Sequence, residues 1–232
     1  TDAARYWVHN NMITVNGQKM GKSLGNFINL SELFSGHHKM LEQAYSPMTI
    51  RFFILQAHYR STLDFSNEAL QAAQKGYRKL MNGLRVLDKM AYPEEGIGMP
   101  DEKLNEELLK LTEDCFRGMN DDLNTARTIA SLFNLLKKIN SLYLGQLPIS
   151  SLTRGTFDTI RTTYTELVTD VLGLKEEPAG DMEEMLDLVL GFYKEAKETK
   201  AYDKVDAIRA ELKKQGIVIK DLKTGIDWAY EE

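Results

Sequence analysis

The chain is organised around a short hairpin and the loop that follows it, Met12-Ile13-Thr14-Val15-Asn16-Gly17-Gln18-Lys19-Met20-Gly21-Lys22-Ser23-Leu24-Gly25-Asn26. Residues 12–15 are typical of a β-strand, and Asn16-Gly17 is a strong signal for a two-residue hairpin turn. The two lysines therefore fall at or just past the returning strand, on a loop that its glycines leave free to bend. We expect this loop to present two cations and several free backbone N–H groups.

A loop of this kind suits a polyphosphate, because lysine is a compact charge and backbone N–H groups can cradle phosphate oxygens. A solvated lysine turn fits the spacing of the residues equally well. The identities of residues 19–26 distinguish the two interpretations. Residues 19–23, followed by Leu24-Gly25-Asn26, resemble the Lys-Met-Ser-Lys-Ser signature of class I aminoacyl-tRNA synthetases and the Leu-Gly-Asn that usually follows it. Gly21 departs from that signature, which has serine there.

Further stretches narrow this resemblance to the cysteinyl-tRNA synthetases. In the family's order they are Tyr6-Trp7-Val8-His9, Arg51-Phe52-Phe53, His58-Tyr59-Arg60-Ser61, Leu63-Asp64-Phe65-Ser66, Met119 to Thr125, Asp206 to Arg209, and Gly216 to Asp221 with Gly225 and Trp228. The 119–125 stretch departs from the family at Leu123 and at the following Ala126. The resemblance covers essentially the whole chain.

The resemblance implies a cysteine–tRNA ligase, in which cysteine attacks the α-phosphate of ATP and the adenylate is then passed to tRNA(Cys). It implies that Lys22 stabilises the departing pyrophosphate, that Lys19 assists, and that both bind ATP (with Mg²⁺) together with Met20, Gly21 and Ser23. A fixed cation placed where charge develops can contribute a few kcal/mol to a reaction. The implied partners are ATP, cysteine and tRNA(Cys).

Two features of that family are absent from this sequence: the His-Ile-Gly-His nucleotide signature and the zinc site for the cysteine thiolate. In the family both precede the lysine loop. The chain also begins without Met, inside an apolar segment. We therefore expect a C-terminal fragment that is inactive alone, with zinc bound elsewhere in the full-length protein and no metal site here.

Composition places few limits on function. The 232 residues are 43% hydrophobic and 27% charged, as in ordinary globular proteins, and the net charge is −5. No apolar run is long enough to span a membrane. The one cysteine, Cys115, excludes an internal disulfide and fits a reducing cytoplasm. We expect a cytoplasmic monomer that binds nucleic acid only through a local basic face.

The hydrophobic patterning predicts a mainly α fold: an antiparallel helical bundle, preceded by the end of an α/β catalytic domain and followed by a small helix-plus-β-hairpin module. The expected segments are 1–46, 47–176 and 177–232. Predicted helices start at Ser31 (as N-cap), Ser46-Pro47, Ser66, Asp101, Asn124, Ser150, Asp181 and Tyr202, and the predicted terminal strands are Ile217–Ile219 and Ile226–Ala229.

Contacts with tRNA require cations on one face, with aromatic rings to stack unpaired bases. On the first bundle helix, Lys75, Arg78, Lys79 and Arg85 follow helical spacing. In the terminal module, where the family reads its anticodon, the candidates are Arg209, Lys213, Lys214, Lys220, Lys223 and Trp228. Surface lysines are common, and Trp228 also fits a core position.

Several alternatives stay open at the level of sequence. His37-His38 resembles a metal pair, but adjacent helical residues point apart and a surface pair fits better. Asp121-Asp122 resembles a catalytic dyad, yet negative charge at a helix N-terminus explains it more simply. The chain could also be a stand-alone helical tRNA-binding or interaction module. A cysteine ligase that uses a small amine is disfavoured by the anticodon-type module.

Overall fold

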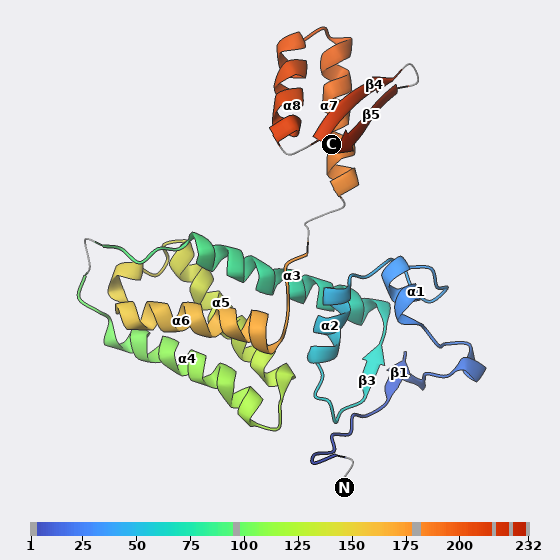
Figure 1. Cartoon of the computed structure of the whole chain (residues 1–232). Coiled ribbons are helices and arrows are strands. Elements are labelled where there is room, and N and C mark those ends of the chain that lie inside the picture. Colours follow the sequence, from blue (N-terminus) through green and yellow to red (C-terminus); the bar gives the residue numbers. More distant parts are fainter. Residues whose placement is uncertain (1–3, 95–97, 178–181, 215–216, 223–224, 231–232) are drawn as a thin grey trace. The chain divides into compact units, whose positions relative to one another are not determined.

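The computed structural model describes residues 4–94, 98–177, 182–214, 217–222 and 225–230. The chain forms two compact units, Thr1–Glu176 and Glu177–Glu232. The first contains β1 (Ile13–Val15), β2 (Gln18–Lys19), α1 (Leu30–Ser35), α2 (Pro47–Leu55), β3 (Leu63–Phe65), α3 (Asn67–Lys89), α4 (Glu102–Asn120), α5 (Thr125–Tyr143) and α6 (Arg154–Glu166). The second contains α7 (Met182–Glu198), α8 (Tyr202–Lys214), β4 (Ile217–Leu222) and β5 (Gly225–Tyr230) (Figure 1).

The predicted hairpin is confirmed. Asn16 and Gly17 both have positive φ, 50° and 76°, as this turn requires, and β1 pairs antiparallel with β2. The sequence did not predict β3, which pairs parallel with β1 from fifty residues further on, with Thr14 opposite Asp64. The Asp64 carboxylate accepts hydrogen bonds from the Thr14 hydroxyl at 2.6 Å and the Gly17 N–H at 2.8 Å. These bonds lower the pKa of Asp64, the Thr14 bond most.

Helix α1 begins at Leu30, two residues earlier than predicted, so Ser31 is not its N-cap. The N-cap is Asn29, whose backbone N–H donates to Glu32 Oε2 at 2.7 Å. An Asn followed by Glu three residues later is a capping-box signal, so the correct start was readable. The other caps are confirmed: the side chains of Ser46, Ser66, Asp101 and Asn124 each accept a backbone N–H three residues on.

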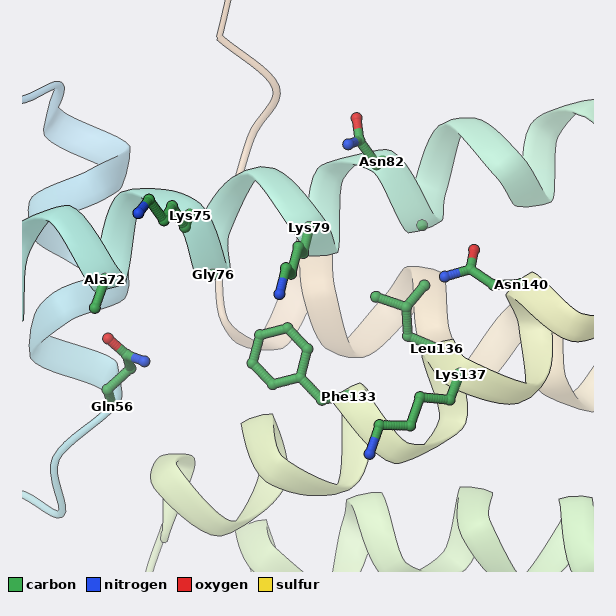
Figure 2. A pocket seen from close by; sticks show the side chains of 11 residues that line it. Gln56, Ala72, Lys75, Gly76, Lys79, Asn82, Phe133, Leu136, Lys137 and Asn140 are labelled. Carbon is green, nitrogen blue, oxygen red and sulfur yellow. The ribbon is translucent and has the colours of Figure 1, made fainter.

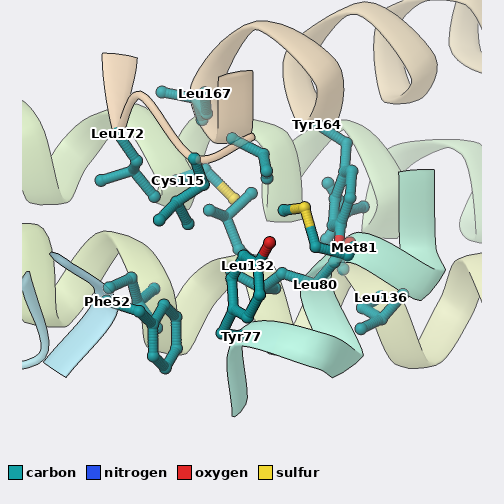
Figure 3. Packing of buried hydrophobic residues seen from close by; sticks show 14 of the residues in the cluster. Phe52, Tyr77, Leu80, Met81, Cys115, Leu132, Leu136, Tyr164, Leu167 and Leu172 are labelled. Atoms are coloured by element: carbon teal, nitrogen blue, oxygen red, sulfur yellow. The ribbon is translucent and has the colours of Figure 1, made fainter. Parts of the chain in front are cut away.

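Helices α3 to α6 form the predicted bundle, and successive helices run in opposite directions (Figure 1). Their buried faces meet in one core, and Tyr164, Leu80 and Leu132 have no exposed surface there (Figure 3). Tyr164 Oη also donates to the Leu80 carbonyl at 3.1 Å. Gly83 lies against this tyrosine, where a Cβ would clash with the hydroxyl oxygen and stand 2.7 Å from Leu136 Cδ1. A glycine is therefore required for α3 to approach α6 this closely.

The helix predicted from Ser150 starts later, at Arg154. Thr153 is its N-cap, and residues 149–151 form a separate 3₁₀ turn. Its far end widens into a π-helical segment, Leu167–Val171, and stops before Gly173 at φ 62°. There the Leu172 carbonyl accepts a 2.8 Å hydrogen bond from Arg51 Nε. This bond joins α2 to the end of the π-helical segment.

The second unit packs two helices on a hairpin whose register places Ile219 opposite Trp228. Its core contains Tyr193, Ala196, Val205 and Ile219. The mainly α fold class, with a helical bundle and a small α+β unit, is thus confirmed. The roles assigned to the three sequence segments stay predictions. In the part of the chain that the structure describes, no helix combines the length and apolar character needed to cross a membrane.

Candidate functional site

The lysine loop follows β2 directly and has a defined backbone. Gly21 is extended, at φ −164°, and residues 22–24 form one 3₁₀ turn that ends at Gly25 with φ 66°. The Leu24 N–H donates to the Gly21 carbonyl at 3.1 Å, and the Gly25 N–H donates to the Lys22 carbonyl at 3.2 Å. The positive φ makes Gly25 the position of the loop where a side chain is most strained.

Asn26 holds the two ends of this loop together. Its side chain is buried, and its Oδ1 accepts the Gly21 N–H at 2.9 Å while its Nδ2 donates to the Lys19 carbonyl at 3.1 Å. The sequence placed Asn26 in the motif but gave it no role. The signal was available, because a buried amide can serve as donor and acceptor at once.

The predicted ATP-binding residues follow one another from the end of β2, which holds Lys19, to the 3₁₀ turn, which holds Lys22 and Ser23. Lys19, Lys22 and Ser23 are all exposed. The Lys22 ammonium lies 5.4 Å from the centre of the Phe27 ring. Among the ion pairs of the described residues, none involves Lys19 or Lys22. Both charges are therefore available to an anion.

Gly21 is not dictated by lack of space. A Cβ at this position would meet no atom nearer than 3.8 Å, and the extended backbone is open to any residue. The serine of the family signature would fit here without strain.

The pair Asp121-Asp122 does not charge the first turn of a helix, so that prediction is wrong. Both residues lie in the turn between α4 and α5, ahead of the N-cap. Asp121 pairs with Arg127 at 2.9 Å. Asp122, at φ 56°, accepts a hydrogen bond from Tyr59 Oη at 2.8 Å and pairs with Arg60 Nε at 3.0 Å. Asp122 therefore ties the bundle to the loop before β3, whereas the Asp121 pair stays within the bundle.

The predicted tRNA contacts of the second unit are only partly described. Arg209 is engaged, since its Nη2 lies 2.6 Å from Asp221 Oδ2 and its guanidinium lies over the Tyr193 ring. A hydrogen bond from Lys197, above all, lowers the pKa of Asp221. Lys213 is exposed near the end of α8. Lys223, and the side chains of Lys220 and Trp228, lie outside the described residues.

On the bundle, Lys75 and Arg78 are exposed on α3, and Lys75 lines a groove between α3 and α5 (Figure 2). Arg78 is not among the residues that line it. His37 is exposed, and within the described ranges no group of three His, Cys, Asp or Glu side chains could hold a metal ion. Cys115 is buried in the bundle core, and this burial raises the pKa of its thiol to about 12.

Two known protein families match separate parts of the chain. The class I (C) tRNA synthetase catalytic domain matches residues 1–75, and the DALR domain matches residues 117–176. A cysteine–tRNA ligase of Cytophaga hutchinsonii is 62% identical over 231 residues, which is 100% of this chain and 46% of the relative. The chain is a homologue of the C-terminal part of cysteine–tRNA ligases. This confirms the family resemblance found in the sequence.

Other cysteine–tRNA ligases match over the same extent. That of Porphyromonas gingivalis is 47% identical over 97% of this chain and 45% of its own length, and that of Bacteroides fragilis is 48% identical over 98% and 45%. The chain thus spans a little under half the length of these relatives. The lysine loop falls within the catalytic-domain match, and the Asp122 turn falls within the DALR match.

Proposed function

We propose that this chain is the C-terminal part of a cysteine–tRNA ligase, which joins cysteine to tRNA(Cys) at the expense of ATP. The observation that carries the proposal is the lysine loop. Two exposed lysines, without an ion pair among the described residues, stand at the end of β2 and on the turn that follows it. Asn26 bonds to the backbone of both parts, and the whole segment lies inside the stretch that matches a class I catalytic domain.

In the proposed first step, a cysteine carboxylate oxygen attacks the α-phosphorus of ATP, and the bond to the β-phosphate oxygen breaks to release pyrophosphate. Negative charge then grows on the leaving group. Lys22 would stabilise that charge, with Lys19 assisting and Met20, Gly21 and Ser23 holding the nucleotide. A cation that meets this charge only when the loop closes favours the transition state over the bound substrate.

The remaining groups of the reaction belong to the proposal as well. Mg²⁺ would accompany ATP on its phosphate oxygens, and zinc would bind the substrate thiolate in the part of the ligase that this chain does not contain. We also propose that the protein is a monomer and that it lies in the cytoplasm, the latter in keeping with its single buried cysteine.

We propose that tRNA(Cys) is bound by the bundle and the second unit, with the anticodon read by residues 177–232. The candidate contacts are Lys75, Arg78, Arg209, Lys213, Lys220, Lys223 and Trp228. Because Arg209 is already paired with Asp221, it would contact RNA only by weakening that pair.

The test is binding of this chain to tRNA(Cys) transcripts, wild-type and anticodon-swapped, at two salt concentrations. We expect weak binding that falls as salt rises, because cation–phosphate contacts release counterions, and that falls further when the anticodon is swapped. Equal binding of both transcripts, or none, would contradict anticodon recognition by the second unit.

A further inference from the structure

The groove between α3 and α5 is a feature of the bundle surface that the lysine loop does not explain. Its volume is about 670 Å³, within the range of small-molecule sites. Residues from α3, α5 and the end of α2 line it: Gln56, Ala72, Lys75, Gly76, Lys79, Asn82, Gly83, Phe133, Leu136, Lys137 and Asn140 (Figure 2).

The lining is cationic in an acidic chain. Three lysines line the groove and no carboxylate of the described residues does, although acidic residues outnumber basic ones in the chain as a whole. Within the part of the chain that the structure describes, Lys75, Lys79 and Lys137 take part in no ion pair. By contrast, neighbouring cations are neutralised: Lys138 pairs with Glu107, and Arg85 pairs with Glu176. The groove therefore concentrates uncompensated positive charge.

The groove also offers an aromatic ring. Phe133 is half-buried, and it lies between the Lys79 and Lys137 side chains (Figure 2). The ring packs edge-on against Phe52, with centroids 6.5 Å apart. Gly76 of α3 lies against both rings, since a Cβ there would stand 2.7 Å from Phe52 Cε1 and 3.6 Å from Phe133 Cζ. A flat group can contact Phe133 only through the part of the ring that lines the groove.

We propose that this groove binds a nucleotide unit, with phosphate at the lysines and the base against Phe133. The lysines sit on both walls, and Lys75 and Lys79 are one helical turn apart, so more than one phosphate can be held. Side-chain amides such as Asn140 both donate and accept, as recognition of a base edge requires. Cations with an aromatic ring are the usual means of binding single-stranded RNA.

An RNA strand is the expected source of the nucleotide, and a free nucleotide is the other. Where that strand belongs to tRNA, the inference rests on the proposed function. A short single-stranded oligonucleotide tests nucleotide binding by the groove separately from the proposed function, because it can occupy the groove whether or not the protein is a cysteine–tRNA ligase.

The experiment compares two double variants of this chain with equal charge. Lys79→Gln with Lys137→Gln removes two cations of the groove. Lys103→Gln with Lys110→Gln removes two exposed cations of α4 that do not line it. Each variant is titrated with a labelled single-stranded RNA hexamer, with ATP and with inorganic tripolyphosphate at several salt concentrations. Unfolding temperatures confirm that both variants fold.

We expect the groove variant to bind RNA about ten-fold or more weakly, and its plot of log affinity against log salt to flatten by about 1.4, or about 0.7 for each phosphate that a lysine no longer neutralises. The α4 variant should change much less. Competition by ATP would identify a free nucleotide, and binding of the hexamer alone would identify a strand. Equal losses in the two variants would overturn the proposal.

A further variant, Phe133→Leu, tests the base. It should weaken binding of RNA and leave binding of tripolyphosphate unchanged. Tripolyphosphate binding as tight as RNA binding, with no effect of Phe133→Leu on either, would show that the base takes no part, and it would equally overturn the proposal.

Discussion

The two glycines of the lysine loop should respond in opposite ways to a side chain. Gly21 is extended and has open space around its Cα, whereas Gly25 holds φ 66°. We therefore expect Gly21→Ser, which restores the family's serine, to be tolerated, and Gly25→Ala to distort the loop. The two substitutions lie in the same short loop, so each is a control for the other.

The expected effect of Gly25→Ala can be estimated from the backbone conformation. The left-handed region costs a non-glycine residue about 1–2 kcal/mol. If the active loop requires this geometry, Gly25→Ala should reduce its population by about 5- to 30-fold, since about 1.4 kcal/mol is a factor of ten. Gly21→Ser should change the free energy of the loop by less than about 0.5 kcal/mol.

Two assays report the population of the loop in its active geometry. The first is hydrogen exchange of the amide at position 25, which donates to the Lys22 carbonyl. The second is cysteine-dependent ATP–pyrophosphate exchange by a chimaera that joins this chain to the N-terminal part of the Cytophaga hutchinsonii ligase. Gly25→Ala should speed exchange of that amide and lower the enzymatic rate, and Gly21→Ser should do neither. Equal losses in both variants would show that the positive φ at Gly25 does not control the loop.

Three further predictions concern the scaffold. Gly83→Ala should lower stability in urea unfolding by about 1–3 kcal/mol, because its Cβ would clash with Tyr164 Oη, whereas Gly155→Ala, with no atom nearer than 4.0 Å, should be neutral or stabilising. Because burial raises the pKa of Cys115 to about 12, a thiol reagent at pH 8 should modify it only after denaturant is added, and fast native labelling would contradict this. The lowered pKa of Asp64 adds stability above about pH 4 that is lost as pH falls through the folded pKa, so the Gly17 amide shift should titrate below about pH 3.9, and a higher midpoint would contradict it.

Local chemistry made much of the fold predictable. Ser46-Pro47, Ser66, Asp101 and Asn124 start helices because a side-chain oxygen satisfies a free N–H within the same turn, a relation that the sequence shows directly. The hairpin at Asn16-Gly17 was predictable for the same reason. These signals act over three or four residues.

Features set by distant contacts were not predictable. Strand β3 forms by pairing with β1, fifty residues away, and its three residues are too few to show the alternation typical of a strand. Asp122 bonds to Tyr59 across a similar separation, so its role was hidden. The two lysines of the candidate site could be predicted from the motif. The groove could not, because its lining depends on how α3 is aligned against α5. Nothing in the sequence aligns Lys79 with Lys137.

Under the proposed function, Lys22 stabilises the pyrophosphate that leaves ATP. The most direct measurement is the single-turnover rate of cysteinyl-adenylate formation at saturating ATP by the chimaera, with and without Lys22→Gln. We predict a fall of about 10²- to 10³-fold, the effect of losing one preorganised charge-stabilising group, with tRNA binding and the unfolding temperature unchanged. An unchanged rate would show that Lys22 does not stabilise the leaving pyrophosphate.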